Sequence, residues 1–558
     1  MKRIGLYFNT VRYLRARQIY ALIRNRLFPQ SVAMSFEGTV AIRSVDCTHA
    51  FIVDRSPVPD EWVFSFLNRS KRFVPGSIDW ASSDMPKLWR YNLHYFDYLF
   101  QEKRSSANKE QLISSWITHN PPGAGDAWEP YTLSLRIVNW IKYFRQSRHD
   151  PPDEWKRSLY HQVFWLERNL EYHLMANHLF KNGVALCIAG LYFEGNDAER
   201  WLAKGRGMIR EELSEQILQD GGHFERSPMY HAIWVVDCLD MLNILQLGSH
   251  SMPLAEASSL RKAAIKGVQF LEDICLSDGE IPLFNDAAAG IAPSTRDILT
   301  YATAILGYVR SGPDNQPHIV CKEPCGYYVI RHDTDIIVID CGPVGPDYQP
   351  GHAHADTLSF ELALDGRRVV VDTGVYDYEP GSRRAYARST RAHNTVCVDG
   401  QDQSEVWGVF RVARRAYPLY ASLTSDRPGH ALFLGAHDGY HRLPGRVTHE
   451  RMIEYASPGM WTVRDTLSGK GEHSLESYLH LHPEYEPHIV AGGVEVRDRT
   501  GRVHMMVEPP ANATVSIQSG FYFPEFGKEI ENSIIVMAYR GRVPVALTYR
   551  MLKTVTPQ

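Results

Sequence analysis

The chain lacks several features that mark particular classes of protein. No apolar run approaches the ~18 residues of a membrane-spanning helix, so no transmembrane segment is predicted. The formal net charge is only −4 over 558 residues, which gives no electrostatic reason to expect a nucleic-acid partner. None of the eight cysteines forms a CxxC pair, and no clean internal repeat is evident.

The cysteines and the N-terminal residues bear on the cellular compartment. Cys321 and Cys325 are the closest pair and could serve as metal ligands or a disulfide, but free thiols in a reducing compartment are favoured. Residues 1–28 carry repeated arginine without an apolar core and cleavage site, so no signal peptide is predicted. This segment is either an interfacial helix or, more commonly, a solvated helix on its own domain. A bacterial, cytoplasmic protein is expected, with a periplasmic or surface-associated location left open.

Composition and length indicate a globular protein of more than one domain. The hydrophobic share of 44% and the charged share of 22% are ordinary for soluble proteins. A length of 558 residues exceeds one compact core, so two or three domains are expected. Aromatic residues make up 11% of the chain, and their flat faces suit sugar rings, although this is a compositional hint only.

The spacing of apolar residues changes along the chain. Residues 1–85 have the pattern of a helix followed by irregular, proline-interrupted sequence. Helical spacing then dominates to about residue 310, in segments of about 12–15 residues joined by short Gly- and Pro-containing loops. From Tyr327 onward, short alternating runs separated by turn residues predict antiparallel strands. We predict an α+β multidomain protein in which an extension (1–85) and an α/α toroid (86–315) precede an antiparallel β-sandwich (316–558). The ligand site is expected in the cleft between the last two.

The stretch Gly351–Val396 holds the densest group of potential ligands. His352, His354 and Asp356 alternate with alanines, so an extended strand would place all three on one face. Asp372 follows a second β-branched run, and His393 follows a basic loop. Two histidines and a carboxylate make a plausible metal shell, which leaves His352 for chemistry. The simpler interpretation is that each histidine is a hydrogen-bonded polar residue.

One geometric condition accompanies the metal hypothesis. Asp365-Gly366 is a strong turn signal between the two strands. A strict two-residue loop would put Asp372 on the opposite face from His354, whereas a longer loop or a bulge would reverse that parity. The metal hypothesis therefore requires such an irregularity.

Three segments of the helical region carry residues suited to chemistry. They are Asn177-His178 near a helix end, the Gly-rich run from Gly221 to His231, and Trp128-Glu129-Pro130-Tyr131 with Arg136 beyond it. Tyr, His and Asn side chains can bind a sugar acid or move its proton. Each signal is weak alone, because Asn177 and Glu225 could be capping residues and Tyr230 a core residue.

Taken together, these motifs resemble those of a known family. Asn177-His178, Tyr230 in SPMYH, GHAHAD at 351–356, VVDTG at 370–374 and HNTV at 393–396 are similar to motifs of the heparinase II/III-like polysaccharide lyases. That family includes heparin/heparan and oligoalginate lyases. The resemblance runs from about residue 85 to the C-terminal end and is strongest from 351 to 396. It implies an α/α toroid followed by a β-sandwich, as the periodicity does independently.

The resemblance implies β-elimination in a uronate-containing acidic polysaccharide. Asn177 and His178 would neutralise the uronate carboxylate and stabilise the developing enolate. Tyr230 or His352 would abstract the C5 proton, and Tyr230 would protonate the departing O4. A tyrosine base would need a lowered pKa. Tyr386 is a second candidate catalytic tyrosine.

The resemblance also implies a metal site, and residues near the motifs are candidate substrate contacts. His354, Asp372 and His393 match the family's metal ligands, usually for Zn²⁺, and the metal, whether zinc or another divalent ion, is expected to be structural. Arg388 and Arg391 could bind an acidic sugar or belong to a solvated basic loop. The other candidate substrate-binding residues are Arg136, Glu225 and Arg226.

Two other functions remain open from the sequence. A glycoside hydrolase on an α/α toroid would need two carboxylates that flank a bond. Its candidates are Asp126, Glu129, Glu225 and Asp286. A non-catalytic glycan-binding or assembly protein is the second alternative. The missing signal peptide and the 1–85 extension suggest bacterial surface or capsular polysaccharide metabolism, and the oligomeric state is left open.

Overall fold

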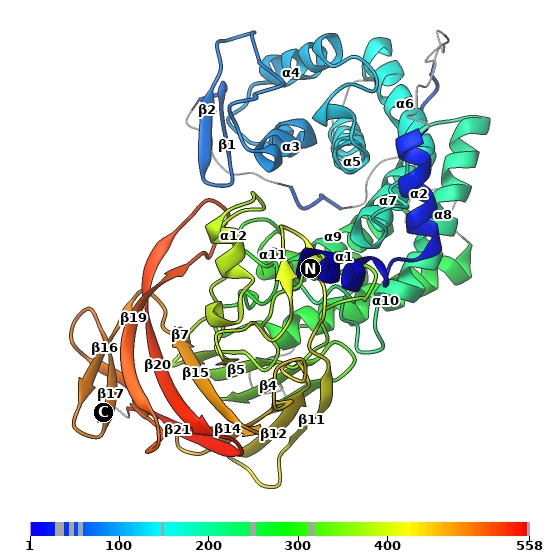
Figure 1. The fold of residues 1–558 in the computed structure, drawn as a ribbon. Helices are drawn as coiled ribbons and strands as arrows, with labels where there is room; N and C mark the ends of the chain where they lie inside the picture. The colour runs from blue at the N-terminus through cyan, green and yellow to red at the C-terminus, as the bar shows by residue number, and fades with distance from the viewer. Residues whose placement is uncertain are drawn as a thin grey trace.

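The protein consists of a helical part followed by a β part (Figure 1). The computed structural model describes residues 2–27, 38, 40–43, 49–53, 60–146, 150–245, 253–310, 312 and 318–554. Within the extension, it shows helices α1 (Lys2–Val11) and α2 (Ala16–Leu27) and a hairpin of β1 (Val63–Phe66) and β2 (Arg69–Arg72), which packs on α3. Parts of the extension, including Cys47, lie outside the described residues. No described helix has both the length and the apolarity needed to cross a membrane.

The main helices form two rows. One row, in which each helix contacts the next, comprises α3 (Lys87–Tyr95), α5 (Pro130–Gln146), α7 (Ala176–Tyr192), α9 (Pro228–Leu245) and α11 (Thr295–Leu306). The other row comprises α4 (Ser106–His119), α6 (Asp153–Arg168), α8 (Asn196–Gln216) and α10 (Leu254–Ile274). Helices α7 and α9 are buried around most of their circumference, as helices packed on several sides must be. Figure 1 shows the resulting two-layered arc, which confirms the toroid prediction.

The β part contains three main antiparallel sheets. The five-stranded sheet has the order β3 (Ile319–Lys322), β4 (Tyr327–His332), β5 (Asp335–Asp340), β6 (Phe360–Leu364) and β7 (Arg367–Val370). The eight-stranded sheet has the order β11 (Pro418–Thr424), β12 (His430–His437), β13 (Thr448–Ala456), β14 (Met460–Ser468), β21 (Val545–Lys553), β18 (Val503–Glu508), β17 (Gly493–Asp498) and β16 (Tyr485–Val490). The four-stranded sheet has the order β19 (Thr514–Tyr522), β20 (Ile530–Arg542), β15 (Glu472–His480) and β8 (Val396–Val398).

One apolar core joins these sheets face to face. Phe360 of the first sheet, Trp461 of the second and Ile535 of the third belong to the same buried cluster. Such packing confirms the predicted sandwich. A separate apolar cluster joins Phe270 and Ile274 of α10 to the five-stranded sheet, so the helical part is fixed on the outer face of that sheet.

The irregular segments between strands carry the remaining short elements. These are a two-stranded ribbon of β9 (Val406–Trp407) and β10 (Arg411–Val412) and a short helix, α12 (Ser382–Ala387). The described cysteines are all free, so Cys321 and Cys325 form no disulfide. The last main helix ends at Leu306 and the β part begins at Ile319, while the domain limits at 85 and 315 stay a prediction.

The predicted strand through His352, His354 and Asp356 is wrong, because residues 351–359 are irregular and β6 begins only at Phe360. The irregularity that the metal hypothesis requires between β6 and β7 is present. Although Asp365-Gly366 forms a two-residue turn, the register between β6 and β7 shifts at Leu362/Ala363.

Glycines set the distance between α7 and α8. A Cβ at Gly190 would lie 2.6 Å from the Leu202 backbone nitrogen. We expect Gly190→Ala to lower the free energy of unfolding by about 1–3 kcal/mol, because the two helices would have to move apart. Gly207, which lies in α8 whereas Gly190 lies in α7, has open space around its Cβ position. Gly207→Ala should instead stabilise by about 0.5–1 kcal/mol in the same denaturant titration. Equal effects of the two substitutions would contradict this account.

Candidate active site

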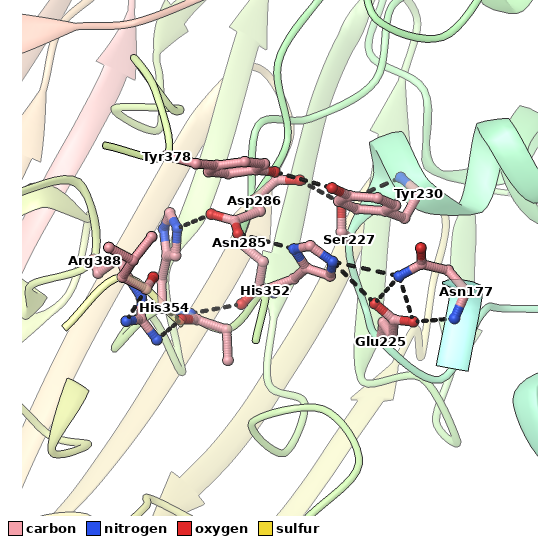
Figure 2. A network of polar contacts seen from close by, with 12 residues as sticks. Asn177, Glu225, Ser227, Tyr230, Asn285, Asp286, His352, His354, Tyr378 and Arg388 are labelled. Carbon is pink, nitrogen blue, oxygen red and sulfur yellow. Dashed lines mark hydrogen bonds and ion pairs between the residues drawn. The ribbon is translucent and has the colours of Figure 1, made fainter. Parts of the chain in front are cut away.

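A polar cluster lies where the first turns of α7 and α9 meet the loops before β6 and after β7 (Figure 2). Asn177 comes from α7, Tyr230 from α9, His352 from the 351–359 segment and Tyr378 from the loop after β7. Two of these segments belong to the helical part and two to the β part. The site therefore depends on the docking of both parts.

Asn177 is held by a buried carboxylate. Its Nδ2 lies 2.9 Å from both Glu225 carboxylate oxygens, and its backbone N–H donates to Glu225 Oε1 at 2.9 Å. Met175 and Ala176 before it have φ of 62° and 52°, a left-handed lead-in that turns the first residues of α7 toward Glu225. The Glu225 side chain is 1% exposed, so it positions Asn177 and does not face solvent, where the predicted substrate-binding role would require it.

His352 lies between two carboxylates. Its Nδ1 is 2.9 Å from Asp286 Oδ2, and its Nε2 is 3.3 Å from Glu225 Oε2 and 3.4 Å from Asn177 Nδ2. The Asp286 contact fixes the plane of the ring and favours a proton on Nδ1. Nε2 is then the ring nitrogen that faces Asn177 and Glu225 in the cluster.

Asp286 links this histidine to the rest of the site. Its other oxygen lies 2.9 Å from His354 Nε2, and Arg384 makes a two-pronged ion pair with the carboxylate. Burial alone would raise the pKa of Asp286, but the Arg384 charge and the hydrogen bonds from His352 and His354 hold it well below its usual range. Asp286 is therefore a permanent anion.

Tyr230 stacks on His352 and shares a hydroxyl contact with a second tyrosine. The ring centroids of Tyr230 and His352 are 3.8 Å apart, and the hydroxyl oxygens of Tyr230 and Tyr378 are 3.2 Å apart. Ser227 caps α9 by accepting from the Tyr230 N–H at 3.3 Å. Burial raises the pKa of Tyr230 well above its usual value, so its hydroxyl keeps its proton at neutral pH. The lowered pKa that a tyrosine base would need is absent.

His178 follows Asn177 and keeps part of its ring accessible. Its side chain is 27% exposed, and its Nδ1 lies 3.0 Å from Glu171 Oε1. Burial lowers the pKa of this imidazole, but the charge and hydrogen bond of Glu171 outweigh burial, so the pKa is raised. His178 therefore carries positive charge to higher pH than a free histidine.

Behind the cluster, three side chains form a candidate metal centre. One ligand atom each from His354, Asp356 and His393 can be chosen so that all lie within 4.8 Å of one another. His354 Nδ1 and His393 Nε2 are buried without a hydrogen-bond partner, which is the state expected of metal-binding nitrogens. Burial lowers the pKa of His354 to about 3 and raises that of Asp356 to about 6. A divalent cation would satisfy both orphaned nitrogens, so these residues fit a metal.

The structure corrects one predicted ligand. Asp372 was expected to bind the metal, but its Oδ2 lies 2.7 Å from His393 Nδ1 and its Oδ1 accepts from the Gly374 N–H at 3.1 Å. Asp356 takes its place in the group. Asp372 orients His393 from behind, just as Asp286 orients His354, and such outer carboxylates tune the ligands they contact.

Three arginines predicted to bind substrate serve the fold instead. Arg136 is fully buried and donates to Gln162 and to two backbone carbonyls of the helical part. Arg226 donates to the carbonyls of residues 224, 324 and 325, and Arg388 to those of residues 353, 408, 409 and 411. All three side chains are buried, so their guanidinium groups are held by the fold and are not presented to a polysaccharide in solvent. Arg391 is exposed, so its substrate contact stays a prediction.

The predicted second tyrosine is also misplaced. Tyr386 packs on Phe521 and Phe523, with ring centroids 5.9 and 6.5 Å away, and the tyrosine that reaches Tyr230 is Tyr378. Tyr378 lies in the loop after β7 and Tyr386 in α12, and no local signal in the sequence separates their roles. Arg384 was also missed. Its ion pair with Asp286 joins positions 98 residues apart, and no local sequence pattern predicts a contact over that separation.

Family comparisons agree with this geometry. Residues 11–305 match the heparinase II/III N-terminus, and residues 323–550 match the heparinase II/III-like C-terminal region. The chain belongs to the heparinase II/III-like family. The match begins at residue 11, whereas the motifs alone suggested a start near residue 85.

Individual relatives are distant. The chain is 24% identical over 462 residues to heparin-sulfate lyase of Bacteroides thetaiotaomicron, and the match covers 73% of this chain but only 63% of that protein. It is 23% identical over 440 residues to FtsZ-localized protein C of Caulobacter vibrioides, with 73% and 71% of the two chains covered. A crystal structure of heparinase III superposes with a TM-score of 0.67 at 19% identity, covering 87% of this chain and 81% of that one, which shows the shared fold.

The placement of Asp356 and Asp372 can be tested with Zn²⁺ as the probe. Asp372→Asn alters a residue that contacts the ligand His393, and we expect it to lower the Zn²⁺ affinity by about 10–100-fold. Asp356→Asn alters a proposed direct ligand, so we expect it to lower the Zn²⁺ affinity further. Competition with a chromophoric chelator measures both affinities. His354→Ala should abolish binding and lower the melting temperature, whereas His119→Ala, on the exposed surface of α4, should do neither. A stronger effect of Asp372→Asn would restore the ligand set predicted from the sequence.

Proposed function

We propose that the protein is a polysaccharide lyase that cleaves a uronate-containing acidic polysaccharide by β-elimination. The observation that carries this proposal is the stack of Tyr230 on His352, with the tyrosine hydroxyl beside that of Tyr378 and the imidazole beside Asn177. A proton donor and a proton acceptor lie side by side there. Relatives named heparin-sulfate lyase support a glycosaminoglycan as the substrate class.

The reaction breaks two bonds and needs one proton taken and one supplied. A base removes the C5 proton of the uronate, the electrons form the C4–C5 double bond, and the C4–O4 bond breaks with protonation of O4. We assign the base to His352 Nε2, because Asp286 holds the ring by Nδ1 and leaves Nε2 toward the cluster. Tyr230 is assigned as the acid, because its raised pKa keeps the hydroxyl protonated until the leaving oxygen gains charge.

The C5 proton becomes acidic enough only when the uronate carboxylate is neutralised. His178 carries positive charge to raised pH and keeps part of its ring exposed. The Asn177 amide has two N–H donors, and one suffices to hold Glu225. The second can meet the carboxylate as negative charge builds on it. We therefore assign carboxylate neutralisation to His178 and Asn177 together.

A metal at His354, Asp356 and His393 has a supporting role in this scheme. Two imidazoles and one carboxylate suit Zn²⁺, so zinc is the proposed ion. A bound cation would supply a fixed charge that holds the 351–359 segment against His393. Because His352 belongs to the same segment, the metal would keep its ring in place beside Tyr230.

The hydrolase alternative fits the geometry poorly. Asp286 is a permanent anion bound to Arg384, and Glu225 is buried against Asn177. Asp126 is paired with Arg90, and Glu129 with Lys87. Each of the four is thus already engaged in an ion pair or hydrogen bonds of the fold, whereas glycosidic hydrolysis needs two available carboxyls that flank the bond. The relative named FtsZ-localized protein C supports the non-catalytic alternative. A screen of acidic polysaccharides by ultraviolet absorbance distinguishes a lyase from a non-catalytic protein, because only elimination creates a conjugated unsaturated uronate.

The role of Tyr230 can be tested by removing one oxygen. On a substrate found in that screen, Tyr230→Phe should lower kcat by roughly 10²–10⁴, because general-acid catalysis is lost while the ring still stacks. Tyr386→Phe is the matched control and should leave turnover near wild type, since Tyr386 packs on Phe521 and Phe523. Wild-type turnover by the Tyr230→Phe protein would show that the proposed mechanism is wrong.

The charge on His178 can be tested through pH. Glu171 raises the pKa of His178 above 6.5, so the imidazolium that binds the uronate persists below the raised value and is lost as pH climbs through it. Glu171→Gln should lower that pKa, and the alkaline rise in KM should begin at lower pH. Glu484→Gln, on the exposed surface of the β part, is the control and should leave the profile unchanged. If the pH dependence of KM is unchanged in Glu171→Gln, the charge on His178 does not contribute to substrate binding.

A further inference from the structure

Helix α1 presents its apolar stripe to solvent. Ile4, Tyr7, Phe8 and Val11 occupy positions i, i+3, i+4 and i+7, which form one face of a helix, and each is at least 50% exposed. The side turned to the protein contains Leu6, Asn9 and Thr10, and Tyr7 at the edge of the stripe packs on Trp407 with ring centroids 4.9 Å apart. Thr10 Oγ1 accepts from Trp407 Nε1 at 3.1 Å and donates to the Val412 carbonyl at 3.4 Å. A surface helix normally turns its apolar stripe toward the core, whereas α1 leaves its apolar stripe largely exposed to solvent.

Helix α2 repeats the arrangement. Ile19, Ile23 and Leu27 lie at spacing i, i+4 and i+8 and are 39–65% exposed, with Tyr20 and Leu22 exposed beside them. The buried residues of this helix are Gln18 and Ala21, and Gln18 Nε2 donates to the Tyr348 carbonyl at 3.2 Å. Nine large apolar side chains are thus exposed on two consecutive helices. An apolar concentration of this kind marks an interaction surface.

The charge of the same segment has one sign. Residues 2–27 contain one lysine, six arginines and no acidic residue. Arg15 and Arg17 pair with Glu215 and Glu211 of α8, which tie α2 to the helical part. The other arginines of the segment have no ion pair among the described residues; these are Arg3, Arg12, Arg24 and Arg26. Exposed apolar stripes flanked by unpaired arginines suit an anionic, partly apolar partner.

A basic cavity adjoins α2. Arg24, directly after Ile23 of the stripe, lines a cavity of about 370 Å³ together with Arg168 and Lys204. The carboxylate there, Glu167, is bound through both oxygens by Arg200 and also pairs with Arg168 at 3.2 Å and Lys204 at 4.0 Å, so three lining cations face one carboxylate that a fourth cation also holds. Positive charge is thus in excess in the cavity, which would take a phosphate group.

We propose that α1 and α2 dock the protein on an anionic lipid surface, with the apolar stripes in the headgroup boundary and the arginines and basic cavity on lipid phosphates. Interfacial helices combine these two features. A second copy of the chain would bring like charge against like charge, and an acidic polysaccharide would not need the apolar stripes. The proposal does not rest on the lyase activity.

The test is co-sedimentation of the full chain with lipid vesicles. We expect binding to vesicles that contain phosphatidylglycerol and little or none to phosphatidylcholine alone, with binding to the anionic vesicles reduced at high salt because the Debye length shortens. Equal sedimentation with both vesicle types, or with neither, would overturn the proposal.

Substitutions distinguish vesicle binding through the apolar stripes from nonspecific adsorption of exposed apolar residues. Phe8→Asp with Ile23→Asp should lower partitioning to anionic vesicles at least tenfold, because each exchange removes an apolar contact and adds a repelled charge. Leu254→Asp is the matched control, since Leu254 is 90% exposed on α10 and lies outside the stripes. Circular dichroism should show both variants folded. An equal loss in the control, or no loss in the double variant, would refute the docking surface.

Two further outcomes decide between occupants. Lys204→Gln should weaken vesicle binding, and if it instead weakens only binding of an acidic oligosaccharide, the lipid assignment of the cavity is wrong. Sedimentation velocity without lipid should give the same mass for wild type and the double variant. A wild-type dimer that the double variant abolishes would assign the stripes to a second copy and overturn the proposal.

Discussion

The buried carboxylate of Asp286 is the contact on which the site depends. Arg384 neutralises it, His352 binds one of its oxygens and His354 the other. One anion thereby orients both the proposed base and a proposed metal ligand. A buried charge is tolerable only when it is paired and hydrogen-bonded, so the three partners are needed for stability as well as for geometry. The catalytic and metal-binding regions are consequently a single electrostatic unit.

The periodicity of the chain carried most of the information about the fold. Helical spacing and strand alternation are local properties, and each is set by which face an element buries. They predicted the toroid and the sandwich without any long-range knowledge. The prediction of an extended strand through His352 and His354 was wrong because it too used only local alternation. This segment is held by contacts with Asp286 and the Asn285 side chain and not by a neighbouring strand.

The candidate site was only partly accessible from the sequence. Motifs identified Asn177, Tyr230, His352, His354 and His393, which the structure places in the two adjoining groups. The choices between Asp356 and Asp372, and between Tyr378 and Tyr386, depend on how loops fold over one another. Arginines were the least predictable residues, because a long side chain can serve an acidic ligand or a set of buried carbonyls with the same local sequence.

One arginine ties the two halves of the molecule together at the site. Arg226 reaches from the segment before α9 to the carbonyls of Pro324 and Cys325 between β3 and β4, while its neighbour Glu225 holds Asn177 and contacts His352. The first turn of α9 and the edge of the five-stranded sheet therefore move as one body. Any rocking of the helical arc over the sandwich, such as a long chain would need to enter, would have to keep or break these Arg226 hydrogen bonds. The groups proposed to transfer protons lie beside this link, so a motion that kept it intact would leave their spacing unchanged.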